Sequence, residues 1–556
     1  MLSKIVEKIG WGFIIVLFLS LLPLINLLTP GLPVTHDGMD HVARIANFYK
    51  GLTDGVLVPR WGEFLNWGYG HPVLMFLYPF SSYVASLVHF VGFSYVDSLK
   101  IVFALGFVAS GLTMYFWAKE QFGEYYAVTA SIVYLFAPYR FVDLYVRGAI
   151  GEHMAFIFPP LILLCMLKIS KNKKLTNKWL VFCSLSLSML LLSHNAISLM
   201  FLPVFIFYAS YLFLTYKNYK KMISIGTAFA VGFSLSSFFI LPAFFEGKFT
   251  LRDIVTGEEY SKRFITDPLA LLYGKWNYGI TGQFTTQIGF ASILGTLLLI
   301  WFFLKNRTKK YTYFFGGFLL IALVSLLLTL SYSNFLYEIV TTFKKFQFPW
   351  RFLSLSAFAF AVLAPSVLVL VKAKNAKKLL VFIICLAAIM PTYTYWQAKE
   401  YKIVTDQFYD RVYFGTTDTG ESAPIWSVRF MEHIPKATIE VIDGQAGIVE
   451  ISRSSVRHSY KINAKTPVRI VENTLYFPGW VVMTNNNKLD VEFQDQNHRG
   501  LITFNLPAGN NSVDVIFTDT KFRMFSNLIT VTTFLCLIMF SLYLVYKSFY
   551  DKKSKK

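Results

Sequence analysis

Charged residues and cysteines are both scarce in this chain. Only 15% of its 556 residues are charged, whereas soluble domains carry about 25%. This shortage excludes an ordinary soluble protein of this length. Every cysteine lies inside an apolar run, so the sequence predicts no disulfide and no cysteine metal site: Cys165, Cys183, Cys385 and Cys536.

Acidic residues are also fewer than basic ones, 32 against 52, which gives a net charge of +20. A charge of this size can signal nucleic-acid binding. Short Lys/Arg-rich loops beside membrane spans, however, mark the cytoplasmic side. The basic residues gather in short polar breaks between apolar runs: 171–178, 217–221, 305–310, 372–378 and 547–556. We therefore expect membrane lipids as partners and no nucleic acid.

Apolar runs fill most of the remaining sequence. Hydrophobic residues make up 55% of the chain, and the mean hydropathy is +0.50. Runs of about 17–24 residues have the length of a bilayer-spanning helix. The sequence predicts about twelve spans and puts every basic break on the cytoplasmic side: about 11–29, 98–118, 125–138, 154–170, 179–193, 196–216, 222–244, 286–304, 312–331, 351–371, 378–396 and 525–547.

The run at 73–93 is the exception. If it crossed the membrane, the basic break at 171–178 would lie outside. We therefore expect an interfacial or re-entrant segment there. The first run follows Lys4 and Lys8 without a small-residue cleavage site, which predicts a retained span.

A polar segment, 397–523, separates the last two spans. Its alternating stretches and turn clusters predict short antiparallel strands in a sandwich. The predicted fold is therefore mainly α, a polytopic transmembrane helical bundle with an extracytoplasmic β-sandwich domain. We expect a transmembrane domain over 1–396 with a first outer loop at 30–97, the β-rich domain over 397–523, and a last span with a basic cytoplasmic tail over 524–556.

Unusual polar residues collect on the predicted outer side. The first outer loop holds two carboxylates and two imidazoles within six residues, His36 to His41, followed by Arg44. Asp40 and Arg44 share a face if this stretch is helical. Asp37 would stand at the helix entrance, as an N-cap or as a functional carboxylate. Paired carboxylates suit general-base work or a divalent cation, Mg or Mn, although no further metal ligand is assured by the spacing.

Three further clusters lie on the same side. Outer arginines beside lipid suggest phosphate binding; salt bridges, helix capping or interfacial anchoring would be purely structural roles for the same residues. The first cluster joins two spans, the second is a tight turn, and the third enters a span: Arg140, Asp143, Arg147, Glu152 and His153; His194; and Lys344, Lys345, Gln347 and Arg351.

A membrane site with carboxylates and cations on its outer face suits chemistry on a lipid-linked phosphate. Nucleotide donors are cytoplasmic, so an outer glycosyltransferase needs a sugar carried on a polyprenyl phosphate. Cations would stabilise the charge of the leaving phosphate. A carboxylate would take the proton of the acceptor hydroxyl, which favours inverting displacement.

Several motifs match a known pattern. Asp37, His41 and Arg44 follow the order Asp, His, Arg in the first outer loop. Other matches extend along most of the chain: Gly55-Val56-Leu57-Val58-Pro59-Arg60-Trp61, Tyr69-Gly70-His71-Pro72, Tyr78-Pro79, Gln347-Phe348-Pro349-Trp350-Arg351-Phe352, Tyr476-Phe477-Pro478-Gly479-Trp480 and Leu506-Pro507-Ala508-Gly509.

On these residues the chain resembles the GT-C superfamily of polytopic glycosyltransferases. More narrowly, it resembles bacterial and archaeal membrane proteins labelled 6-pyruvoyl-tetrahydropterin synthase-related. The resemblance implies that Asp37 is the catalytic base and that the first outer loop holds interfacial helices. Asp40 departs from the pattern. Arg60, within the first long motif, joins the expected substrate-binding residues.

The function expected from the sequence is therefore transfer of a sugar from a polyprenyl-phosphate donor to an extracytoplasmic glycan, lipid or protein. A transporter or lipid flippase would instead put its charges near mid-membrane in discontinuous helices. A non-catalytic scaffold for an envelope polymer and a polysaccharide polymerase or ligase are two further candidate functions. The sequence names neither the sugar nor the acceptor, and it fixes no cofactor.

Overall fold

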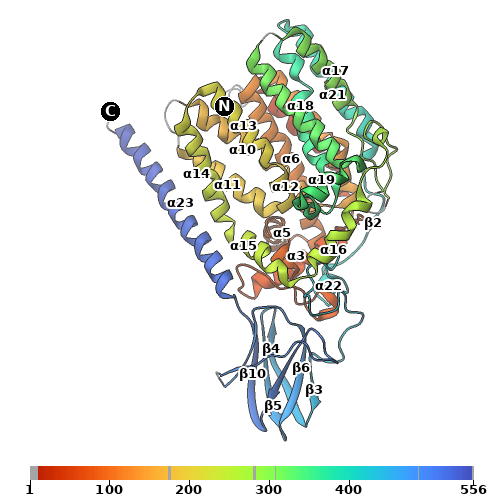
Figure 1. Ribbon diagram of the computed structural model, residues 1–556, viewed down its shortest axis with the longest axis vertical. Coiled ribbons are helices and arrows are strands. Elements are labelled where there is room, and N and C mark those ends of the chain that lie inside the picture. Colours follow the sequence, from red (N-terminus) through yellow and green to blue (C-terminus); the bar gives the residue numbers. More distant parts are fainter. Residues whose placement is uncertain (1–9, 173–176, 280–282, 307, 486, 554–556) are drawn as a thin grey trace.

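The computed structural model describes residues 10–172, 177–279, 283–306, 308–485 and 487–553. Figure 1 shows a thick helical bundle above a β-sandwich, with α23 (Lys521–Lys553) leaning along one side. Four shorter helices lie between the bundle and the strands: α3 (Gly38–Thr53), α5 (Phe80–Phe90), α16 (Arg252–Glu259) and α22 (Asp406–Tyr409). Among the basic residues of the predicted cytoplasmic side, some lie outside the described residues: Lys4, Lys8, Lys173, Lys174, Arg307, Lys555 and Lys556.

The bundle is built from long apolar helices. Among the described residues, eight are long and apolar enough to cross a membrane, or ten if each of two bent pairs is one span. The eight are Trp11–Leu28 (α2 and η1), Tyr95–Phe122 (α6), Ile150–Lys171 (α9 and α10), Asn195–Tyr216 (α12 and α13), Lys309–Thr329 (α18), Pro349–Val369 (η9, α20 and η10), Lys374–Tyr395 (α21 and η11) and Lys521–Lys547 of α23.

The bent pairs and two shorter apolar helices complete the bundle. They are Glu124–Leu135 (α7) with Pro138–Arg147 (α8 and η3), Tyr219–Leu235 (α14) with Ser237–Phe249 (α15 and η4), Asn177–Ser193 (α11) and Phe290–Lys305 (α17). Each predicted span coincides with one of these helices. The mainly α bundle is thus confirmed, and the predicted number of spans is consistent with it without being fixed.

The bend between α7 and α8 has a local cause. The α7–α8 pair bends by 48° directly before Pro138. Proline lacks an amide donor and disfavours helical geometry in the residue before it. The chain then follows a wide π-helical turn over Val142–Arg147, a form often found at functional sites. The bend carries Arg147 out of the line of α7.

The segment 73–93 forms no long helix. It contains α4 (Val73–Phe76) and α5 (Phe80–Phe90), separated by Tyr78 and Pro79. At 1.5 Å per residue, eleven residues of α5 rise about 16 Å, well short of the roughly 30 Å hydrocarbon core. This agrees with the prediction that 73–93 does not cross. Helix α5 packs against α3 (Gly38–Thr53) and α6.

The strands form the predicted sandwich. One antiparallel sheet has the order β4-β5-β10-β7-β8 and the other β3-β6-β9. Alternating side chains fill the core between them, among them Tyr460, Ile470 and Val513. The strands are β3 (Ile439–Asp443), β4 (Ala446–Ser454), β5 (Arg457–Ala464), β6 (Val468–Leu475), β7 (Trp480–Thr484), β8 (Asn487–Leu489), β9 (Leu501–Leu506) and β10 (Gly509–Phe517).

A connector of residues 397–438 precedes these sheets and packs on the bundle. Its strand β2 (Tyr401–Lys402) pairs with β1 (Leu32–Pro33) of the predicted first outer loop. It also holds α22 (Asp406–Tyr409). Part of the segment assigned to the β-rich domain therefore contacts α3. The division of the chain into domains at 1–396, 397–523 and 524–556 stays a prediction.

The sequence motifs meet where the bundle joins the sandwich. Trp61 packs edge-on against Trp480, with ring centroids 5.3 Å apart, and Phe76 lies 5.9 Å from Phe477. The fully buried Arg523 donates to Glu246 at 2.8 Å and to the Pro478 carbonyl at 2.6 Å. Residues distant in sequence thus form one tightly packed contact between the bundle and the sandwich, which we call a joint.

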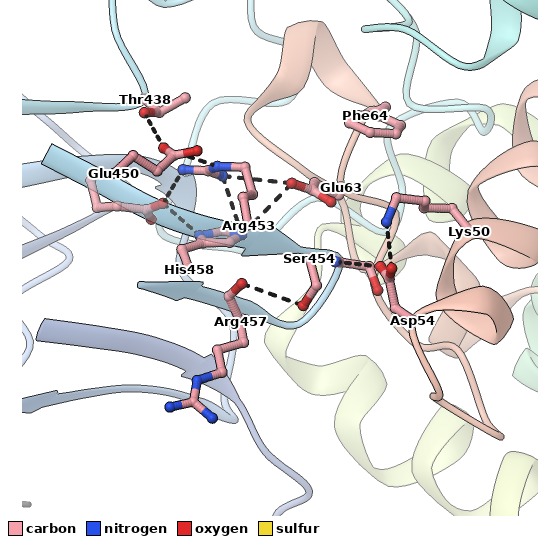
Figure 2. A network of polar contacts seen from close by, with 12 residues as sticks. Lys50, Asp54, Glu63, Phe64, Thr438, Glu450, Arg453, Ser454, Arg457 and His458 are labelled. Carbon is pink, nitrogen blue, oxygen red and sulfur yellow. Dashed lines mark hydrogen bonds and ion pairs between the residues drawn. The ribbon is translucent and has the colours of Figure 1, made fainter. Parts of the chain in front are cut away.

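Figure 2 shows a second joint, made of charges. The β4 residue Arg453 reaches Glu63, in the predicted first outer loop, at 3.7 Å. It also reaches Glu472 of β6 at 3.1 Å. His458 contacts the same Glu472 at 2.7 Å. Burial raises the pKa of Glu63, and the charges of His458 and Arg453 oppose that shift. Arg453 therefore holds together carboxylates from both sides of the joint.

Replacing Arg453 with alanine is expected to destabilise the protein by about 3 kcal/mol, because it leaves buried carboxylates without their cation. Thermal unfolding in detergent measures the change. The matched control is Arg457→Ala on the same hairpin, whose exposed pair with Asp514 contributes at most about 1 kcal/mol. Equal destabilisation by both variants would contradict the role of the joint.

The predicted orientation can be tested by labelling. A cysteine in place of the exposed Asn510 on β10 should react with a membrane-impermeant maleimide on intact cells, whereas one in place of Lys374, at the start of α21, should react only after lysis. The reverse pattern would invert the topology.

Candidate active site

Asp37 stands at the entrance to α3. Its backbone amide donates to the Arg147 carbonyl at 2.9 Å, and the His36 amide donates to the Val146 carbonyl at 3.0 Å. Asp37 has the N-cap position, yet its side chain makes no capping hydrogen bond. No described residue forms a hydrogen bond or ion pair with its half-buried carboxylate. The main chain therefore holds Asp37 in place and leaves the carboxylate available.

Glycine makes this close approach possible. Gly148 has a left-handed backbone, with φ of 68°, and a Cβ there would lie 2.3 Å from the Thr35 hydroxyl. Any side chain at this position would push the Asp37 turn away from η3.

Beside Asp37 lies a buried network of charges. Arg147 Nη1 donates to Asp143 at 2.5 Å and to Glu152 at 2.8 Å. Arg351 Nε contacts the same Glu152 oxygen at 3.3 Å, and the Tyr139 hydroxyl donates to the other oxygen at 2.7 Å. Two of the expected clusters, separated by about 200 positions, thus share one carboxylate.

Aromatic rings hold the two arginines as well. The Arg147 guanidinium lies 4.5 Å from the centre of the Trp350 ring, and that of Arg351 lies 5.1 Å from Phe348. Both rings belong to the Gln347–Phe352 motif. Cation–π contacts of this kind stabilise a guanidinium without neutralising it.

Arg44 joins from α3. Its Nη1 lies 2.9 Å from His41 Nδ1, and its Nη2 donates to the Thr417 carbonyl of the connector. Burial and the charge of Arg44 hold the pKa of His41 well below its usual value, so the ring is neutral and accepts this hydrogen bond. Arg44 is buried and has no carboxylate ion pair among the described residues.

Asp40 faces the connector. It accepts a hydrogen bond from the Tyr413 hydroxyl at 2.8 Å. Burial raises the pKa of Asp40, while Tyr413 and Arg44 act in the opposite direction. Asp40 is thus tied to the connector, whereas the carboxylate of Asp37 is not.

His194 and Tyr78 complete the group. His194 Nδ1 accepts from the Ile197 amide at 3.3 Å and caps α12 (Asn195–Met200). Its ring lies 4.7 Å from that of Tyr78. Helix capping, one structural role expected in these clusters, therefore applies to His194 itself.

Other expected site residues lie apart from this group. Arg140 is enclosed by three aromatic rings, the nearest being Phe156 at 4.1 Å, and makes a hydrogen bond to Ser110. His153 contacts the Phe103 carbonyl at 3.1 Å. Both stabilise the packing of α6 against the neighbouring helices.

The remaining predicted residues contact the edges of the site or the joint. Lys344 pairs with Glu338 at 2.6 Å, and Lys345 lies over Phe244. Gln347 donates to Glu421 of the connector at 3.2 Å. Arg60 pairs with Asp519 at 3.2 Å, beside the start of α23. A substrate role for these residues, as for the others, stays a prediction.

Among the described residues, no three or more His, Cys, Asp or Glu side chains are arranged to hold a metal ion. The possible Mg or Mn site therefore gains no ligand set from the described part of the chain. The site instead holds the Asp37 carboxylate, which has no partner among the described residues, together with three arginines and Tyr78. The arginines are Arg44, Arg147 and Arg351.

Sequence reasoning missed the connector and Tyr78 as parts of the site. Tyr413 and Thr417 contact Asp40 and Arg44 across 373 positions, and no local pattern signals such a contact. Tyr78 stood within a recognised motif, before a proline that fixes its backbone. Its membership of that motif was the sequence signal that could have suggested a functional role.

A polytopic helical membrane protein with a β-sandwich and a charged site near their junction is the class that this fold and site define. Comparison identifies the family. The family model described as 6-pyruvoyl-tetrahydropterin synthase related domain, membrane protein, matches residues 74–398. The chain belongs to this family, as its motifs predicted.

A curated relative adds a second match. An uncharacterized protein of Lactococcus lactis subsp. cremoris (strain MG1363) is 23% identical over 326 residues. The match covers 56% of this chain and 52% of that protein. The chain thus spans about half the length of the curated relative that it matches.

Solved glycosyltransferases resemble the chain in structure. Arabinofuranosyltransferase AftD from Mycobacteria is 13% identical, with a TM-score of 0.44, over 69% of this chain and 27% of that chain. Archaeal oligosaccharyltransferase AglB from Archaeoglobus fulgidus, in complex with an inhibitory peptide and a dolichol-phosphate, is 16% identical, with a TM-score of 0.39, over 73% and 56%. Similarity at this level carries no statement about the activity or the substrate of this chain.

Replacing Glu152 with glutamine is expected to lower stability by about 3 kcal/mol, because Arg147 and Arg351 lose a shared buried counter-charge. Thermal unfolding of the full chain in detergent tests this. Lys344→Ala, which removes an exposed ion pair, should leave the unfolding temperature unchanged. A Glu152→Gln protein as stable as the wild type would rule out the shared-carboxylate network.

Proposed function

We propose that this protein is a membrane glycosyltransferase that moves a sugar from a polyprenyl-phosphate donor to an extracytoplasmic acceptor. The observation that carries the proposal is the Asp37 carboxylate, which has no partner in the part of the chain that the structure describes. The main chain of Asp37 is hydrogen-bonded to the turn that bears Arg147. A free carboxylate can take a proton from the attacking acceptor hydroxyl. Buried guanidinium groups beside it can stabilise the charge of the departing phosphate.

In this reaction the Asp37 carboxylate takes the proton of an acceptor hydroxyl. The acceptor oxygen forms a bond to the anomeric carbon as the bond from that carbon to the phosphate oxygen breaks. The polyprenyl phosphate leaves with the electron pair, and Arg44, Arg147 and Arg351 stabilise its charge. Direct displacement of this kind inverts the anomeric centre.

The apolar surroundings support a lipid-borne donor. The bundle exposes many large apolar side chains to its surroundings, as a membrane protein does. A lipid tail can lie along such a surface while its phosphate reaches the arginines. The proposed acceptor is an envelope glycan, a lipid or a protein.

Changing Asp37 to asparagine should lower sugar transfer about 100- to 10,000-fold, because the amide cannot take the proton. The full chain is reconstituted with a panel of polyprenyl-phosphate sugars, and transfer and donor binding are measured separately. Binding should be retained, since the arginines are intact.

Asp97→Asn is the matched control. This residue also lies at the start of a helix, α6, where it accepts from the Ser94 hydroxyl and pairs with Lys100. It should leave transfer unchanged. Full transfer by Asp37→Asn would remove the base from the proposal. Movement of the lipid-linked sugar across the bilayer without transfer would favour a flippase.

A further inference from the structure

Tyr78 carries an aromatic hydroxyl that the proposed reaction does not use, although its ring is held firmly beside the site. It follows α4 and precedes Pro79, which restricts its backbone. On one side its ring lies 4.7 Å from His194, which is itself fixed as the cap of α12.

Gly151 supports the other side of the ring. A Cβ at Gly151 would come within 1.8 Å of Tyr78 Cε2, so only glycine leaves room for the ring here. Gly151 directly precedes Glu152 in α9 (Ile150–Ala155), the carboxylate shared by Arg147 and Arg351. The ring of Tyr78 is thus packed against the helix that carries the charge network.

The Tyr78 hydroxyl has no hydrogen-bond partner among the described residues, and its side chain is partly exposed. Arg351 and Glu152, whose charges act on Tyr78, are by contrast bonded to each other. A hydroxyl held in place yet left unpaired next to arginines is available to a ligand.

Charges from both sides of the site act on this hydroxyl. Burial raises the pKa of Tyr78, Arg44 and Arg351 lower it, and Asp37 and Glu152 raise it further. The net shift is upward, so at neutral pH the phenol keeps its proton and acts as a hydrogen-bond donor.

We propose that Tyr78 is a further catalytic residue, whose hydroxyl donates a hydrogen bond to a phosphate oxygen of the lipid-linked donor between Arg44 and Arg351. This inference rests on the proposed function for the reaction itself, but the phosphate contact is a property of binding. The proton stays on Tyr78 throughout. As negative charge builds on the leaving phosphate, the hydrogen bond strengthens.

The test uses Tyr78→Phe in the full chain, which keeps the ring and its contacts and removes only the hydroxyl. Affinity for undecaprenyl phosphate in detergent should fall about tenfold, as expected for a hydrogen bond to a charged group. Transfer should fall about 100-fold, the loss typical of one donor to a developing anion.

Tyr83→Phe is the matched control. Tyr83 lies on α5, five positions away, and its hydroxyl donates to the Leu57 carbonyl at 2.7 Å, outside the site. It should bind undecaprenyl phosphate and transfer sugar as the wild type does. Gly151→Ala, which displaces the Tyr78 ring, should reproduce the binding loss of Tyr78→Phe while its unfolding temperature reports on folding.

The outcomes separate this inference from the proposed function. If Tyr78→Phe binds and transfers like the wild type, the Tyr78 contact is overturned and the transferase stands. If binding depends on Tyr78 but no donor sugar is transferred, the contact stands and the transferase fails. If the wild type does not bind undecaprenyl phosphate, the Tyr78 contact is overturned whatever the transfer result.

Discussion

The cost of burying charge in an apolar bundle governs this structure. An isolated guanidinium taken out of water loses several kcal/mol of solvation, which only close counter-charges and hydrogen bonds offset. Glu152 supplies that compensation to Arg147 and Arg351 together. Because the two arginines come from opposite halves of the chain, satisfying one carboxylate fixes how η3, α9 and η9 meet.

The same requirement explains the role of the connector. Arg44 has no carboxylate pair among the described residues and is satisfied by His41 and by the Thr417 carbonyl. Asp40 is satisfied by Tyr413. Within the described part of this site, Asp37 keeps an unpartnered carboxylate, because its main chain is engaged and its side chain is not. The site therefore consists of stabilised cations around a carboxylate and a hydroxyl that have no partner among the described residues.

Much of the architecture could be predicted from composition and charge. Apolar length finds helices, and the asymmetry of Lys and Arg orders them, because both depend on local transfer free energies. The position of the basic loops also led us to predict that 73–93 is not a span, and the structure has two short helices there. The β-sandwich followed from alternation in 397–523, whereas the packing of the connector on α3 left no periodic signal.

Only some residues of the candidate site were predicted correctly to lie together. Asp37, Arg147, Glu152 and Arg351 were expected from unusual charge on the outer side, and they lie in or beside one network. Arg140 and Arg60 carried the same signal, yet one is caged by aromatic rings and the other joins the β-sandwich to α23. Residue type shows that a buried charge needs a partner, but it does not name that partner.

The sequence by itself determined the class of molecule: a polytopic helical protein with a β-sandwich, in a family marked by its motifs. These properties follow from hydrophobicity and from short-range patterns, which each segment carries alone. Only the tertiary structure decided which polar groups of the site bind one another and which stay available. That choice depends on contacts across hundreds of residues, such as Arg44 with Thr417, and it leaves the side-chain oxygens of Asp37 and Tyr78 without partners among the described residues.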